Sequence, residues 1–318
     1  MELCLYTDCV SNLPFDEALD LAAGLDVEAV EIAAGDRSSL PPERVLELVD
    51  DPAALVSFQE MFRSRGMRVA AVNCTAWAFG STFGDELSGV LKACIRLAHA
   101  LGVDKIVTAS GCPGTPPTIR AIEWMTLPWP RSYFEDLDAQ WNEGVELWKG
   151  VADFAGAHGI RSIALELHPL QLVSNAPTLQ RFRAQVGPVI GASIDPSTMF
   201  WQRMDPIRVI HALGPAVHHV HLKDVEVHDD QLAVSGAVLT TTPFEEPRQR
   251  AWTYRTVGFG RDADFWSPLI EALHDVGYRD VVSVANKDPY LPQEMGANLA
   301  ARFVSGLLSK NEQQVGHS

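Results

Sequence analysis

The segment from Ile163 to Asp224 decides the fold, because it holds three short apolar strands that each end in a candidate metal ligand. The strands read Ser162-Ile-Ala-Leu-Glu166-Leu-His168, Val189-Ile-Gly-Ala-Ser-Ile-Asp195 and Val217-His-His-Val-His221-Leu-Lys223-Asp224. A parallel strand that is buried on both faces reads as a near-continuous apolar run, so a carboxylate or imidazole at its last position lies at a rim rather than in the core. We expect the three polar ends to converge.

The spacing of these ends fits consecutive strands of a parallel barrel. Glu166 lies 29 residues before Asp195, which lies 26 residues before His221, enough each time for a strand, a crossover helix and the next strand. Because successive barrel strands place their carboxyl ends side by side, we expect Glu166, Asp195 and His221 to share one divalent ion. This ligand set suits Mn²⁺, the first candidate, and equally Mg²⁺, Co²⁺ or Zn²⁺. In the structural alternative, the acids cap helices and His221 is a core histidine.

Length and charge limit the classes of protein to consider. The 318 residues contain no polar or Gly/Ser-rich linker, which favours one domain over residues 1–318. The formal charge of −16 argues against a nucleic-acid partner, since affinity for nucleic acid comes chiefly from Lys and Arg that neutralise phosphates. No window approaches the ~18 apolar residues of a membrane span, so no membrane partner is expected.

Cysteine usage and the first residues predict a cytoplasmic protein. The five cysteines are an odd number without a CxxC pair, as is usual in a reducing cytosol. The first residues, Met-Glu-Leu-Cys-Leu-Tyr-Thr, lack the basic start and the apolar run of ~7–15 residues that a signal peptide needs.

Eight apolar strands alternate with helices along the chain, which predicts a (β/α)8 TIM barrel of the α/β class. Besides the three strands quoted above, strands are expected at Leu3–Thr7, Val27–Ile32, Met67–Val72, Lys105–Ala109 and Asp280–Ala285. Helices are expected at Pro14–Gly24, Pro41–Val49, Pro52–Arg65, Leu87–Leu101, Phe134–His158, Asp262–Val276 and Pro292–Leu308. No Gly-rich turn follows the first strand, which argues against a doubly wound sheet.

Two long loops, after the fourth and seventh strands, and two strand-end side chains supply candidate substrate contacts. The loop from Ser110 to Tyr133 is rich in Gly, Pro and Trp, and its Trp129 is a candidate wall over a sugar ring. The polar loop from Val225 to Val257 is a candidate lid, in which Arg255 is expected to hold a substrate oxygen. Glu31 and Asn73, at the ends of the second and third strands, are expected to face the same mouth. The alternative is that both loops only pack.

Four motifs resemble the sugar phosphate isomerase/epimerase family of xylose isomerase-like TIM barrels, and the resemblance covers nearly the whole chain. They are Glu166-Leu-His168-Pro169, Asp195-Pro196-Ser197 followed by Phe200-Trp-Gln, His221-Leu-Lys-Asp224, and Trp252-Thr-Tyr-Arg-Thr-Val-Gly-Phe-Gly260. The resemblance implies a divalent metal held by Glu, Asp, His and a second Glu at the ends of strands five to eight. The first three fall on Glu166, Asp195 and His221, but the position of the fourth is Ala285.

The missing acid at residue 285 separates two reactions. In the epimerases that the chain resembles, two metal-bound glutamates relay a proton between the faces of the substrate, so this two-base route is not expected here. One base on one face suffices for β-elimination from a 3-oxo-glycoside, and the chain resembles the large subunit of C-glycoside deglycosidases, which are lyases of this type. The alternatives are an isomerase or epimerase that recruits Asn286 or Asp288, and a barrel that binds sugar without turnover.

His168 is the expected base, because it lies two residues beyond Glu166 on the same face and imidazole titrates near neutral pH. In the alternative, it only orients Glu166. Lys223 is expected to stabilise the enolate, unless it only pairs with Asp224. The substrate is expected to be a keto-sugar or a large oxidised glycoside. The deglycosidase resemblance implies a small β-rich partner subunit, and a homo-oligomer is the alternative.

Overall fold

A computed structural model describes residues 1–25, 27–35, 38–75, 78–80, 83–113, 131–169, 171–238 and 242–315. Eight parallel strands form a closed barrel in the order β1-β12-β9-β8-β7-β5-β3-β2. This confirms the predicted (β/α)8 fold. The strands are β1 Glu2–Tyr6, β2 Ala29–Ala34, β3 Arg68–Cys74, β5 Lys105–Ala109, β7 Ser162–Glu166, β8 Ile190–Ile194, β9 Val217–Leu222 and β12 Val281–Val284.

The seven predicted helices are present, with ends shifted by a few residues in most cases. They are α1 Phe15–Gly24, α2 Pro42–Asp50, α3 Pro52–Arg63, α5 Lys92–Ala100, α6 Ser132–Ala157, α11 Ala263–Asp275 and α12 Gln293–Val315. The prediction over Leu87–Leu101 missed a change of helix type, because a π-helical turn, Leu87–Leu91, precedes α5. Further helices are α4 Phe83–Glu86, α7 Ala176–Val186, α8 Pro196–Phe200, α9 Pro206–Leu213 and α10 Asp229–Ser235.

By density of contacts the chain divides into two compact units. The first consists of Met1–Glu31, Met61–Ala70 and Ile194–Ser318, and the second of Ile32–Glu60 and Ala71–Ser193. Each unit is described separately below. The assignment of residues 1–318 to one domain stays a prediction.

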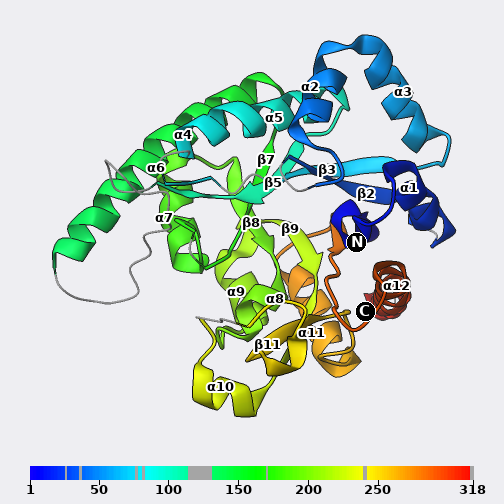
Figure 1. Ribbon diagram of the computed structural model, residues 1–318, viewed down its shortest axis with the longest axis vertical. Coiled ribbons are helices and arrows are strands. Elements are labelled where there is room, and N and C mark those ends of the chain that lie inside the picture. Colours follow the sequence, from blue (N-terminus) through cyan, green and yellow to red (C-terminus); the bar gives the residue numbers. More distant parts are fainter. Residues whose placement is uncertain are drawn as a thin grey trace. The chain divides into compact units, whose positions relative to one another are not determined.

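In the first unit, β1 pairs with β12 on one side and with the start of β2 on the other, and β12 also pairs with β9. The register places Tyr6 beside Glu31, and Ser283 beside both Cys4 and His221. Helix α11 packs beside α9 and α12 (Figure 1). Helix α9 begins where the Asp205 carboxylate accepts hydrogen bonds from two amides of the first turn, as an N-cap aspartate does. The sheet and these helices bury an apolar core.

In the second unit, β3, β5, β7 and β8 pair in sequence, with Val107 beside Ala164 and Glu166 beside Ser193. Helix α7 begins with a capping box between Asn175 and Thr178. The indole of Trp148, which is fully buried, donates a hydrogen bond of 2.9 Å to the Ser110 carbonyl. Residues 114–130 of the first predicted long loop, Trp129 among them, lie outside the described residues.

The second predicted loop is an ordered excursion, which we define as residues Asp224–Arg255. Its ends form an antiparallel pair, β10 Asp224–Val227 and β11 Trp252–Arg255, and α10 and a 3₁₀ turn, Pro247–Gln249, lie between them. The ring of Trp252 stacks on Trp201 with 5.0 Å between centroids, and its indole donates to a backbone carbonyl. The described parts of the excursion are thus largely helix and strand, and its role as a lid stays a prediction.

A buried carboxylate, that of Asp224, ties the start of the excursion to the segment that follows it. Its Oδ1 accepts from the Val225 amide at 2.8 Å, and its Oδ2 accepts from the amides of Gly260 and Arg261 at 3.0 and 2.8 Å. Residue 260 must be glycine for this approach, since a Cβ there would lie 2.5 Å from the Val225 carbonyl oxygen.

All five cysteines are free and buried. Within the described ranges, no helix combines the length and the apolar character that crossing a membrane requires.

Candidate metal centre

Glu31, His219 and His221 bring one carboxylate and two imidazoles together in the first unit. The Nε2 atom of His219 lies 2.9 Å from Oε2 of Glu31, and Nε2 of His221 lies 2.9 Å from Oε1. His219 and His221 are two residues apart on β9 and therefore share a face of the strand. Because β1 and β12 separate β9 from β2 in the sheet, this face is the concave side, across which Glu31 reaches both rings.

These three side chains are buried, with 0%, 0% and 2% of their surface exposed. Burial raises the pKa of the Glu31 carboxyl, but the adjacent imidazoles of His221 and His219 outweigh it and leave that pKa well below its usual range. Glu31 is therefore an ionised acceptor for Nε2–H groups. The Tyr6 ring stacks on His221 at 5.3 Å between centroids, which fixes the orientation of this imidazole.

The cluster has the composition of a divalent-metal site. One carboxylate oxygen and the two ring nitrogens all lie within 4.8 Å of one another. One oxygen and two imidazole nitrogens suit Zn²⁺, Mn²⁺ or Co²⁺, and three protein ligands leave positions for water or substrate, as in catalytic sites. The residues present therefore fit a metal ion, and the same Nε2 atoms that now face Glu31 would lose their protons to bind it.

The cluster shares only His221 with the predicted metal ligands. Glu31 was predicted to contact substrate, and His219 was not predicted to have a role. The role of His219 could have been predicted from the sequence, because it lies two residues before His221 in the same strand and therefore points to the same side.

Asp195 lies directly after β8 and is the N-cap of α8. Its Oδ1 accepts a hydrogen bond of 2.9 Å from the Ser197 amide, so it caps a helix as the structural alternative expected. Its Oδ2 lies 3.7 Å from Nζ of Lys223. Glu166 belongs to the second unit. One ion shared by Glu166, Asp195 and His221 therefore stays a prediction.

In the second unit, Glu166 contacts Asn73, as expected for two polar residues at strand ends. Nδ2 of Asn73 lies 3.5 Å from Oε1 of Glu166. Beyond them, Nδ1 of His168 lies 2.7 Å from the Pro169 carbonyl oxygen, which can only accept. In the neutral ring the proton is thus on Nδ1 and the lone pair is on Nε2, the arrangement that a general base requires.

Lys223 lies between a carboxylate and an aromatic ring. Besides its contact with Asp195, its ammonium lies 3.9 Å from the centre of the Tyr254 ring, in the geometry of a cation–π contact. In the alternative reading, Lys223 pairs with Asp224. The Asp224 carboxylate already has another cationic partner, because the guanidinium of Arg261 lies 3.2 Å from its Oδ1.

The end of β12 carries no acid at residue 285, and the two candidate replacements hold other groups. Ala285 is buried, and its amide donates to the Leu222 carbonyl at 3.2 Å. Asn286 accepts from the Thr256 hydroxyl at 3.3 Å. Asp288 accepts from the Thr256 amide at 2.9 Å and lies 3.2 Å from Nε of Arg255.

Arg255, expected to hold a substrate oxygen, bridges two carboxylates, those of Asp288 and Glu226. Burial lowers the pKa of the Arg255 guanidinium. The two carboxylates raise it by more than burial lowers it, so the net shift of this pKa is upward. Arg255 therefore fastens the excursion to the segment after β12.

Comparison with known proteins points to one family. The family model for xylose isomerase-like TIM barrels matches residues 19–305. The uncharacterized protein YfiH of Bacillus subtilis (strain 168) is 32% identical over 314 residues, which cover 98% of this chain and 100% of that protein.

Two solved structures share the fold at low sequence identity. A crystal structure of the IOLI protein with a zinc atom has a TM-score of 0.68 and 20% identity, and the match covers 98% of this chain and 99% of that one. D-psicose 3-epimerase with D-tagatose, from Clostridium cellulolyticum H10, has a TM-score of 0.66 and 16% identity, with coverage of 97% and 99%.

Proposed function

The chain belongs to the xylose isomerase-like TIM barrel family, and on that premise we propose that it is a divalent-metal-dependent enzyme that removes the proton next to the carbonyl of a keto-sugar. The observation that carries the proposal is the buried cluster of Glu31, His219 and His221. This cluster shares only His221 with the ligand set that the sequence predicted. Its carboxylate comes from Glu31 on β2, whereas the residue after β12 is Ala285.

A divalent ion held by this cluster would polarise the substrate carbonyl and stabilise the negative charge of the enolate. Zn²⁺ and Mn²⁺ both suit the ligands, and the zinc atom in the IOLI structure supports the first. Lys223 adds a fixed positive charge in the same unit, and the Asp195 carboxylate orients it. His168, in the second unit, stays the predicted base, and its contact with the Pro169 carbonyl leaves the lone pair on Nε2.

The reaction that we propose is β-elimination from an oxidised glycoside. Removal of the proton from the carbon next to the ketone leaves an enolate, and the bond to the leaving group on the following carbon then breaks. One base suffices for these steps, which agrees with an alanine at residue 285. An isomerase or epimerase is the second candidate, supported by the ketose epimerase that shares the fold.

The first test measures metal content after purification with Mn²⁺ or Zn²⁺. Glu31→Gln and His219→Ala are expected to lose the metal while circular dichroism stays unchanged, and Asp230→Asn, on the exposed side of α10, is the matched control. Asp195→Ala and Glu166→Gln test the ligand set that the sequence predicted. Stoichiometric metal in both Glu31→Gln and His219→Ala would contradict the proposed cluster.

The second test assays 3-oxo-glucosides and ketoses in D₂O. Release of an aglycone identifies a lyase, whereas deuterium incorporation with conserved mass identifies an isomerase or epimerase. Turnover of ketose phosphates alone would overturn the lyase proposal. A barrel that binds sugar without turnover predicts neither product nor stoichiometric metal.

A small β-rich partner subunit belongs to the same proposal. Val234 and Val238 on the excursion expose 89% and 63% of their surface, apolar area that a bound subunit would cover. Size-exclusion chromatography, with and without the product of any small neighbouring reading frame, separates a hetero-complex from a homo-oligomer.

A further inference from the structure

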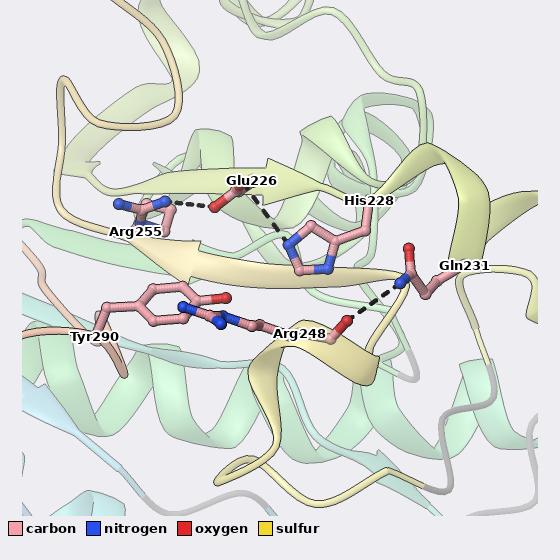
Figure 2. A pocket seen from close by; sticks show the side chains of 6 residues that line it. All are labelled: Glu226, His228, Gln231, Arg248, Arg255 and Tyr290. Carbon is pink, nitrogen blue, oxygen red and sulfur yellow. Dashed lines mark hydrogen bonds and ion pairs between the residues drawn. The ribbon is translucent and has the colours of Figure 1, made fainter.

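An open pocket of about 480 Å³ lies beside the excursion, and of the candidate site residues described above only Arg255 lines it. Its lining comes from five parts of the first unit: β10, α10 with its N-cap, the 3₁₀ turn Pro247–Gln249, β11 and the segment after β12 (Figure 2). The lining residues are all polar: Glu226, His228, Gln231, Arg248, Arg255 and Tyr290.

Contacts within the wall hold most of these side chains in place. The Glu226 carboxylate pairs with Arg255 and lies 3.9 Å from Nε2 of His228 (Figure 2). Nδ1 of His228 lies 2.7 Å from the Arg250 carbonyl oxygen. Nε2 of Gln231 donates to the Arg248 carbonyl at 3.2 Å. The amide oxygen of Gln231 points away from this carbonyl and can accept a hydrogen bond from a ligand. A wall fixed in this way loses little side-chain entropy when a ligand binds.

The wall offers hydrogen-bond acceptors and donors in similar numbers. Glu226, the amide oxygen of Gln231 and the Tyr290 hydroxyl accept, and Arg248, Arg255 and the Tyr290 hydroxyl donate. Each hydroxyl group of a sugar or polyol both donates and accepts, so this mixture complements a polyhydroxylated ring.

An anionic ligand fits less well. The guanidinium of Arg255 is neutralised by Glu226 and Asp288, and Glu245 and Glu246 line the hollow beside Arg248. A phosphate or carboxylate would face these acids, and a phosphate dianion usually binds more than one unpaired cation.

We propose that this pocket binds a neutral polyhydroxylated ring, a saccharide or polyol, and serves as an outer subsite for the second ring of a glycoside. The pocket follows closely on β9: Glu226 is five positions beyond His221, which limits their Cα separation to about 17 Å of extended chain. Its role as an outer subsite rests on the proposed function, whereas the binding of a neutral sugar ring does not.

The experiment titrates the full chain with methyl β-D-glucopyranoside, glucuronate and glucose 6-phosphate, followed by calorimetry and by NMR of the ligand. The neutral glucoside is expected to bind most tightly. Arg248→Ala, Gln231→Ala and Tyr290→Phe are each expected to weaken it about fivefold, the effect of one hydrogen bond. Arg208→Ala, which removes an exposed arginine of α9 outside the pocket, is the matched control and is expected to leave binding unchanged.

Glu31→Gln separates this inference from the proposed function, because it disables the metal cluster without touching the pocket. Glucoside binding that survives in Glu31→Gln and weakens in Arg248→Ala supports the pocket, whatever the reaction proves to be. Binding unchanged in all three pocket variants overturns the inference. Tighter binding of glucuronate or glucose 6-phosphate than of the glucoside overturns the assignment to a neutral ring.

Discussion

Lys223 and Asp195 lie 3.7 Å apart, from Nζ to Oδ2, at the carboxyl ends of the neighbouring strands β9 and β8. This pair brings together polar side chains from the ends of two neighbouring strands, whereas the shared site of Glu166, Asp195 and His221 stays a prediction. A lysine held by a carboxylate over the Tyr254 ring is fixed in position before any substrate arrives, which is the property an electrostatic stabiliser of an enolate needs.

The first prediction concerns this lysine. Lys223→Met keeps the length of the side chain and removes its charge, so kcat is expected to fall roughly 10²-fold or more, as when one stabiliser of a developing charge is lost. Metal content is expected to stay unchanged. Lys149→Met on α6 is the control, and a kcat within about threefold of the parent protein would exclude a role for Lys223 in the chemistry.

The second prediction restores the missing acid. Ala285→Glu adds a carboxylate at a buried position, so the metal-free protein is expected to melt at a lower temperature, and bound Mn²⁺ or Zn²⁺ is expected to reverse the loss. Proton exchange on ketoses is expected to rise while elimination falls. Differential scanning fluorimetry with and without EDTA measures the first effect, and Ala285→Gln controls for size. Equal metal affinity and activity in both variants would place residue 285 outside the site.

The third prediction concerns Asp224. Asp224→Asn replaces one acceptor oxygen by an amide NH₂ that must face backbone N–H groups, so the free energy of unfolding is expected to fall by about 1–3 kcal/mol. Urea denaturation measures this loss. Asp229→Asn, an exposed change on α10, is the comparison. A stability equal to that of the parent would mean that the amides find other acceptors.

The fourth prediction concerns the thiols. Burial raises the pKa of Cys9 to about 12 and that of Cys112 to about 11, so at pH 8 these groups remain protonated and unreactive. Ellman's reagent is expected to modify none of the five cysteines in the native protein and all five in urea. Rapid reaction of the native protein would show that a buried segment opens readily.

The sequence was sufficient for the strands because each is a short apolar run between turn signals. Every predicted strand is present, as are the end positions of Glu166, Asp195 and Lys223. The π-helical turn at Leu87–Leu91 was not predictable in this way, since its apolar spacing also fits an ordinary α-helix.

The metal cluster was only half predictable. Alternation along β9 places His219 and His221 on one face, which the sequence already shows. The contact of both rings with Glu31 depends on how four strands curve, because it joins residues 188 and 190 positions apart across the concave side of the sheet. The pattern of apolar and polar residues along each strand does not predict which side chains meet across the barrel. The same holds for the pocket, whose walls meet only after β10 pairs with β11.

The closure of the excursion by Asp224 also has an evolutionary consequence. Because the β10–β11 pair and the Asp224 carboxylate hold the base of the excursion, we expect the segment between Val227 and Trp252 to tolerate changes in length. Such changes are expected to cost mainly the entropy of closing a loop, which grows by about 0.6 kcal/mol for each doubling. On the proposed role of the pocket, we expect relatives to diverge around Gln231 and Arg248 before they diverge at Glu31, His219 and His221.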